Sequence, residues 1–296
     1  MASSLRNSAA FGTPRTESLE GVIDIHCHCD PDSIARPIDA IDLARLARSR
    51  SMRGLVLKNH YEPTASMAYL VRKEVPGIEV FGAIDLDLTV GGINPAAVRY
   101  MTKVKGGWGR VVWMPSFDAE NHVRDAKEDR PFVSVSSRGE LLPAVEEVIS
   151  IIAAHDLVLA TGHSSPDENL MLISEARRQG VKRIVVTHAM IAPVCMQPPQ
   201  MQEAARMGAY IEFVYNGLIG PNKMFEFAEY AGAIRGLGHE VCILATDLGQ
   251  AVNPLHPDGM AALIGGLRDQ GFTGDEISRM SRENPARLLG LSWPEE

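Results

Sequence analysis

Two histidines separated by one residue, His26 and His28, stand at the end of a short apolar run near the N-terminus. Residues 22–28 have the β-branched, apolar composition of a buried strand. Because residues two apart on a strand point to the same face, the two imidazoles would lie side by side, where they could bind one divalent metal ion. Taken alone, such a pair is better explained as two unrelated histidines, one packed in the core and one exposed.

Ligand-type residues also stand at the ends of five other strand-like runs. These ends read Lys58-Asn59-His60, Asp85-Leu86-Asp87, Thr161-Gly162-His163, Thr187-His188 and Thr246-Asp247. Of the nine histidines in the chain, five fall at strand ends once His26 and His28 are included, whereas random placement would scatter them through helices and loops. The pattern therefore predicts a metal centre.

Strand-like and helix-like segments alternate along the chain. The strands are expected near 21–28, 54–60, 80–87, 110–115, 157–163, 183–188, 209–215 and 241–247, with helical patterns between and after them, the last at 274–291. Eight strands, each followed by a helix, predict a single-domain α/β protein, a closed (β/α)8 TIM barrel over residues 20–296. An open doubly wound sheet would show a Gly-rich phosphate turn after its first strand, and the turn here is His-Cys-His-Cys-Asp-Pro. In such barrels catalytic groups lie at the C-terminal ends of the strands.

Composition narrows the classes of partner. The chain has 296 residues, 45% of them hydrophobic, and a net charge of −8 with no basic run, which disfavours nucleic acid and anionic membranes. No apolar run approaches the length of a membrane span. Residues 1–19 are expected to form a flexible arm that does not resemble a secretory signal. Four cysteines, at 27, 29, 195 and 242, are expected to be free thiols in a cytoplasmic protein, although a Cys-x-Cys metal site at 27 and 29 is an alternative.

These features together resemble the amidohydrolase superfamily of metal-dependent hydrolases. The matching residues are His26, His28, His163, His188 and Asp247, with the Asn-Pro-Ala-Arg-Leu-Leu-Gly run at 284–290, and they follow the family's order after residue 20. The chain looks most like a small, poorly characterised branch in which strand two ends in Lys-x-His. The resemblance implies that His26, His28 and Asp247 hold one metal ion, that His163 and His188 hold a second, and that an acidic group bridges the two.

The bridging group is where the chain departs from the family. The common bridge is a carboxylated lysine at the end of strand four, but residues 111–116 contain no lysine or carboxylate. Lys58 is the best substitute because it shares the parity of His60, and a buried lysine can react with CO2 as the neutral amine. Alternatively, Lys58 is a cationic substrate anchor and Asp85 or Asp87 bridges, or the site holds a single ion. His60 is either a third imidazole near the metal or a group that supports the ligands from behind.

The expected activity is metal-dependent hydrolysis of an amide, lactam, lactone or ester bond in a small, anionic molecule. Two zinc or manganese ions would activate water, with Asp247 as general base and acid and with His188 or Lys58 polarising the attacked oxygen. Asp24 is expected to orient an imidazole. The long loop at 116–139 is expected to be functional, as a lid. Candidate substrate contacts are His60, Arg36, Tyr215 and Asn216, although Arg36 is better explained by a salt bridge with Asp32 or Asp39.

Other functions stay open at this stage. A decarboxylase on the same barrel would release CO2, and a Schiff-base lyase would use Lys58 as its nucleophile. A non-catalytic binding barrel would tolerate Asp247→Asn. Such barrels often associate, so a homo-oligomer is also open, but no stripe of residues marks an interface.

Overall fold

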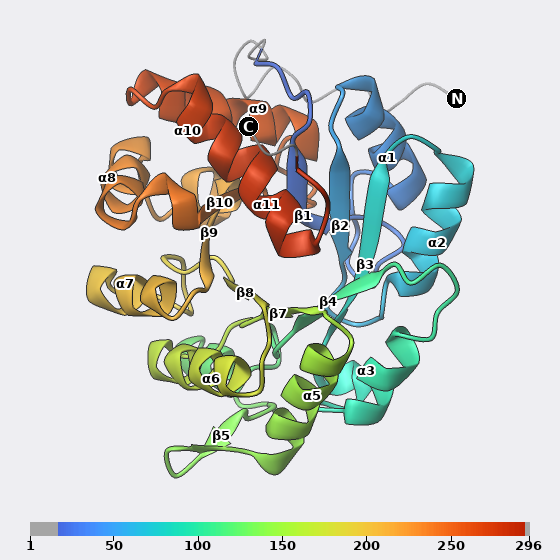
Figure 1. Cartoon of the computed structure of the whole chain (residues 1–296), viewed down its shortest axis with the longest axis vertical. Helices are drawn as coiled ribbons and strands as arrows, with labels where there is room; N and C mark the ends of the chain where they lie inside the picture. Colours follow the sequence, from blue (N-terminus) through green and yellow to red (C-terminus); the bar gives the residue numbers. More distant parts are fainter. Residues whose placement is uncertain (1–16, 294–296) are drawn as a thin grey trace.

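A computed structural model describes residues 17–293 of the chain. Eight parallel strands form one sheet in the order β1-β2-β3-β4-β7-β8-β9-β10 (Figure 1). The strands are β1 (Ile23–His28), β2 (Gly54–Lys58), β3 (Glu79–Asp85), β4 (Gly109–Trp113), β7 (Val158–Ala160), β8 (Arg183–Val186), β9 (Tyr210–Val214) and β10 (Cys242–Ala245). Each predicted strand is present, and most end one to three residues before the ligand-type residue that was expected to terminate them.

The sheet closes on itself between its first and last strands. The Asp247 backbone N–H donates to the His26 carbonyl at 2.9 Å, and the His28 N–H donates to the Leu248 carbonyl at 2.9 Å. Cys27 and Leu248 accordingly form a parallel bridge beyond the end of β10. The predicted (β/α)8 barrel is therefore confirmed, and its closure brings residue 247 directly beside residues 26 and 28.

Helices surround the barrel, and most begin at the residue types that favour a helix start. Asp39 caps the first helix by accepting the N–H groups of Ile41 and Asp42, and Ser165 and Glu168 form a capping box. The helices are α1 (Ala40–Ser49), α2 (Ala65–Glu74), α3 (Pro95–Met101), α4 (Glu120–Asp125), α5 (Pro143–Ala154), α6 (Pro166–Arg178), α7 (Pro198–Arg206), α8 (Phe227–Leu237), α9 (His256–Asp269), α10 (Gly274–Ser278) and α11 (Asn284–Leu289).

The hydrophobic core has two layers. The outer layer lies between strands and helices and contains Cys27, Cys29 and Cys242, as strand parity predicted for these thiols. All four cysteines are free. The inner layer fills the barrel and includes Ile23, Phe81 and Trp113.

Helix α11 closes the N-terminal end of the barrel, where Figure 1 shows it in front of β1 and β2. Its residues Ala286, Leu288 and Leu289 belong to the inner layer, and the Asn284 side chain donates to the carbonyls of His239 and Cys242 at the start of β10. The run at 284–290 therefore packs against the N-terminal end of the barrel and closes it, and the opposite end remains for chemistry.

The connection between β4 and α5 is long and structured. It contains α4 and a two-stranded hairpin of β5 (Ser136–Ser137) and β6 (Glu140–Leu141). We call residues 116–142 the β4–α5 segment.

The predicted arm at residues 1–19 lies mostly outside the described part of the chain. Within that part, Glu17 pairs with Arg268 at 3.1 Å and Leu19 is buried. Among residues 17–293 no helix is both long and apolar enough to cross a membrane.

Candidate metal centre

The predicted chemical groups gather at the C-terminal end of the barrel and are buried there. His26 and His28 end β1, and Lys58 ends β2. His60, His163, His188 and Asp247 follow the ends of β2, β7, β8 and β10. The histidines and Lys58 are each at most 6% exposed, and the Asp247 side chain is 14% exposed. His188 and Asp247 both have positive φ, at 27° and 52°, a costly conformation for residues other than glycine that is commonest at functional sites.

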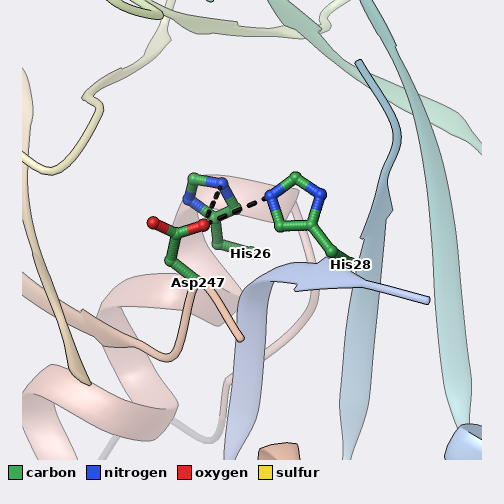
Figure 2. Close-up of side chains that lie close together, drawn as sticks. All are labelled: His26, His28 and Asp247. Atoms are coloured by element: carbon green, nitrogen blue, oxygen red, sulfur yellow. Dashed lines mark ion pairs between the residues drawn. The ribbon is translucent and has the colours of Figure 1, made fainter. Parts of the chain in front are cut away.

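His26, His28 and Asp247 point toward one another (Figure 2). The Nε2 atoms of both histidines lie 3.2 Å from the same oxygen, Oδ1 of Asp247. Burial lowers the pKa of His28 to about 3, so its imidazole is neutral. Burial alone would raise the pKa of Asp247, but His26, His28 and His188 hold it well below its usual range, and the group stays a carboxylate.

This geometry fits a divalent ion. Two ligand atoms about 2.1 Å from one ion, at an angle of roughly 100–110°, lie about 3.2–3.4 Å apart. The buried Nε2 of His26 has no hydrogen-bond partner among the described residues, although it lies beside Asp247. Neutral imidazoles and a carboxylate are ligands that zinc and manganese accept. The three residues therefore form a candidate metal site whose ligand atoms already have the separation that one ion requires.

Two further side chains fix this group from behind. Nδ1 of His26 lies 3.2 Å and 3.3 Å from the two carboxylate oxygens of Glu212, in the middle of β9. Donation from Nδ1–H to Glu212 leaves the Nε2 lone pair aimed at Asp247, which is how carboxylates commonly orient metal-binding histidines. Asn216 donates to the other oxygen of Asp247 at 3.2 Å.

Asp24 does not have the role that strand parity predicted for it. The pairing of β1 with β2 shifts register between Asp24 and Cys27, so simple alternation does not carry from Asp24 to His26. The Asp24 carboxylate instead accepts from the Thr246 hydroxyl at 2.6 Å and from the Thr246 N–H at 3.0 Å. It braces the end of β10, and Glu212 takes the orienting role.

His163 and His188 form a second pair of facing imidazoles. Their Nε2 atoms lie 3.0 Å apart, and Nδ1 of His188 has no hydrogen-bond partner among the described residues. Burial lowers the pKa of His188 to about 4 and, together with His188, lowers that of His163 well below its usual range. Both are neutral, and their separation again suits two ligands of one ion.

A second group of three ligand-type residues comprises His60, Asp85 and Asp87. The hydroxyl of Ser116 lies among them. It donates to Oδ2 of Asp85, and lies 2.7 Å from Nδ1 of His60 and 3.2 Å from Oδ2 of Asp87. Burial, reinforced by Asp87, raises the pKa of Asp85 well above its usual range, and burial raises that of Asp87 to about 6. The hydroxyl of Ser116 therefore occupies the position between the three side chains.

Lys58 faces the barrel interior as predicted. Its Nζ lies 3.5 Å from Oδ2 of Asp85 and 5.3 Å from the centre of the Trp113 ring. Asp85 therefore pairs with Lys58, and these two of the three predicted bridging candidates lie at the ends of the neighbouring strands β2 and β3. Whether Lys58 is carboxylated stays a prediction.

The predicted substrate contacts lie in different surroundings. Arg36 donates from Nε to Asp32 at 2.8 Å, which is the salt bridge that the sequence favoured. Tyr215 lies in the outer hydrophobic layer, near Gly259 of α9. Asn216 contacts Asp247, and the His60 ring is stacked between His28 and Phe117 at centroid distances of 4.7 Å and 3.8 Å.

Sequence reasoning missed Glu212, Ser116 and the contact of His122 with His163. A signal for Glu212 was present, because it is the one carboxylate in the otherwise largely apolar strand β9. Ser116 and His122 belong to the β4–α5 segment, and no periodic pattern places a loop residue in space.

Comparison with known proteins supports the fold and leaves the activity open. The sequence profile of DUF6282, a family of unknown function, matches residues 21–212. Among proteins with curated descriptions, none matches this chain. No activity can be carried over from a relative at this level.

Solved structures of similar architecture belong to hydrolases. An organophosphorus hydrolase from Deinococcus radiodurans is 17% identical over 92% of this chain and 93% of its own, with a TM-score of 0.62. A phosphotriesterase homology protein from Escherichia coli, in complex with phosphate, is 17% identical over 92% and 100%, with a TM-score of 0.60. A protein engineered for organophosphate hydrolysis from a weak promiscuous lactonase is 16% identical over 92% and 97%, with a TM-score of 0.60. At such identities the likeness shows the shared barrel fold.

Proposed function

This chain belongs to the DUF6282 family of unknown function, and we propose from its site that it is a metal-dependent hydrolase of a small, anionic molecule. One observation carries the proposal. Two buried histidine nitrogens converge at 3.2 Å on one oxygen of a carboxylate that stays ionised, and Glu212 sets the tautomer of one of them. A buried core histidine would instead have its ring nitrogens satisfied by neighbouring donors and acceptors.

His26, His28 and Asp247 would hold the first ion. His163 and His188 would hold a second, with Lys58 or Asp85 between the two positions. Zinc and manganese both suit imidazole and carboxylate ligands. A divalent ion bound here would lower the pKa of its water and so supply hydroxide near neutral pH.

The protein's own groups would handle the protons and the substrate charge. Asp247 keeps one carboxylate oxygen at the imidazoles while Asn216 holds the other, so the carboxylate is oriented to take a proton from water and return it to the leaving group. His188 and Lys58 are both buried at the same end of the barrel and would polarise the attacked oxygen. Because the site excludes most water, these charges act at short range with little screening.

Substrate choice follows from the charges around the site. Lys58 is a buried cation, and its partner Asp85 has a raised pKa, so a carboxylate or phosphoryl group of a substrate could compete for the lysine. Two of the similar barrels are hydrolases of organophosphorus compounds, and one of these two derives from a lactonase. Lactones that carry a carboxylate therefore head the list of substrates to test, followed by anionic phosphoesters, lactams, amides and other esters.

The first test is metal content per chain in the purified wild type, Lys58→Ala and His26→Ala. About two ions in the wild type and about one or none in Lys58→Ala would support a binuclear centre bridged through Lys58, while one ion in both would make Lys58 a substrate anchor. His26→Ala should lose the first ion. No metal in the wild type after growth with zinc and manganese would overturn the proposal.

The reaction type is tested separately on the metal-loaded protein. Incorporation of 18O from labelled water into the product would identify hydrolysis. Release of CO2 without incorporation would identify the decarboxylase instead, and trapping of the substrate on Lys58 by borohydride would identify the lyase.

The four free thiols, three of them buried, support a cytoplasmic location for this activity.

A further inference from the structure

The β4–α5 segment delivers a histidine that the proposed function has not used. Helix α4 places His122 against His163, with Nδ1 of one ring 2.7 Å from Nδ1 of the other. The two rings are nearly parallel and meet edge to edge through these nitrogens, with centroids 4.9 Å apart and planes 11° apart. His122 is half-buried, while His163 is buried. The contact therefore joins the surface segment to a candidate metal ligand.

Neighbouring contacts hold α4 in this place. The Asn121 side chain donates to the His163 carbonyl at 3.0 Å and to the Pro193 carbonyl at 2.9 Å. On the other side, Phe117 stacks on His60 at 3.8 Å. Because the segment is tied to residues after β2, β7 and β8, the position of His122 is defined by several independent contacts.

The contact between the two Nδ1 atoms restricts the tautomer of His163. A hydrogen bond at 2.7 Å needs one proton between the two nitrogens, so one ring donates from Nδ1 and the other accepts at Nδ1. If His163 donates from Nδ1, its Nε2 keeps a lone pair, 3.0 Å from Nε2 of His188. If His122 donates instead, His163 carries its proton on Nε2 and cannot bind an ion there.

We propose that His122 is a positioning residue that accepts the Nδ1–H of His163 and thereby aims Nε2 of His163, together with Nε2 of His188, at the second metal ion. The inference rests on the proposed function, because it requires an ion between these two imidazoles. In this arrangement the imidazole of His122 does for His163 what the carboxylate of Glu212 does for His26.

The test uses two substitutions that separate the hydrogen bond from the ring contact. His122→Asn keeps an acceptor oxygen near the position of Nδ1 but removes the ring, whereas His122→Phe keeps a planar ring of similar size but has no acceptor. His155→Phe, at an exposed histidine after α5, is the control for the exchange of imidazole for phenyl. Ion binding is measured by titration of the metal-free proteins with zinc and manganese against a competing chelator.

The proposal expects two ions per chain in the wild type. In His122→Phe the second ion should bind about 10–100-fold more weakly with the first unchanged, because losing the partner of a ligating histidine has typically that effect. In His122→Asn both affinities should stay within a few-fold of the wild type. Equal binding in His122→Phe and the wild type, or equal weakening in both variants, would overturn the proposal in favour of no role or a packing role.

A second readout does not depend on metal. The 15N and 13C shifts of His163 in the metal-free wild type report which ring nitrogen carries the proton, and the proposal expects Nδ1. Protonation on Nε2 would contradict it. A wild type that binds only one ion, or none, would also overturn it, whereas a chain that binds two ions but hydrolyses nothing would overturn only the proposed function.

Discussion

The barrel mouth contains two groups of nearly the same composition that differ in what lies at their centre. His26, His28 and Asp247 surround a point at which two histidine nitrogens meet one oxygen, and no hydrogen bond from the described residues satisfies Nε2 of His26. His60, Asp85 and Asp87 surround the hydroxyl of Ser116. Ligand-type residues at short distances are therefore not sufficient for a metal site, because the space between them must also be available.

The carboxyl groups of the two groups also differ in how readily they hold a negative charge. In the first, one carboxylate faces several imidazoles, which keep the pKa of Asp247 low despite burial. In the second, two buried carboxyls share one nearby cation, Lys58, and burial raises the pKa of both. The first group holds a negative charge ready for a cation, and the second favours protons. We therefore expect the first group to bind a metal ion more tightly than the second.

The largest expected effect comes from Asp247→Asn. It removes the anionic ligand and the proposed base, so the first ion should bind more than about 100-fold more weakly and hydrolysis should fall by about 10²–10⁴-fold. Asp87→Asn makes the same chemical change in the second group and should leave the affinity for the first ion within a few-fold. Chelator competition on both variants checks this. If both variants lose affinity for the first ion equally, the two groups do not differ in metal binding as we propose.

The pH dependence of stability is the next largest effect. The folded-state pKa of Asp87 is about 6, above its unfolded value of 3.8, so its contribution to stability is fully present below pH 3.8 and is lost as pH rises through about 6. The loss amounts to about 3 kcal/mol over this window. Asp87→Asn cannot titrate and keeps an oxygen for the N–H groups of Ser116 and Asp118.

The measurement is urea unfolding of both metal-free proteins between pH 4 and pH 8. The free energy of unfolding of the wild type, minus that of Asp87→Asn, should fall as pH rises. Asp24 also has a raised pKa, about 6, but it is present in both proteins and cancels in the difference. A difference that is constant, or that grows with pH, would mean that Asp87 is not buried with a preference for its proton.

Ser116→Ala tests whether the hydroxyl at the centre of the second group is what keeps a metal ion out of it. Without the hydroxyl, His60 and Asp85 lose a buried partner, and the free energy of unfolding of the metal-free protein should fall by about 1–3 kcal/mol. Manganese should then enter the vacated centre, raise the metal content by one ion and restore part of the stability. Ser164→Ala, at a buried serine whose hydroxyl has no partner among the described residues, is the control and should do neither. An unchanged metal content in Ser116→Ala would mean that charge, and not the hydroxyl, excludes the ion.

Sequence alone predicted the parts of this site that obey strand geometry. The eight strands, the inward His26 and His28, and the outward Cys27 follow from period-two alternation, and the chain order of strands brings Asp247 beside them once the barrel closes. Alternation failed at Asp24, because a register shift in β1 cannot be read from residue types. Ser116 and His122 were out of reach because their positions depend on how the β4–α5 segment folds back, which involves contacts far apart in the sequence.

Glu212→Gln tests the support behind the first group and has the smallest expected effect. An amide oxygen can still accept one hydrogen bond, but it carries no full negative charge and cannot serve both the His26 ring and the His188 N–H as two carboxylate oxygens do. The first ion should therefore bind about 10–100-fold more weakly while all three ligands remain. Glu203→Gln on α7, an outward-facing residue that pairs with Arg206, controls for the loss of a carboxylate elsewhere. If Glu212→Gln binds the ion as tightly as the wild type, burial and Asp247 alone arrange the first group for metal binding. The parallel between Glu212 and His122 then no longer holds.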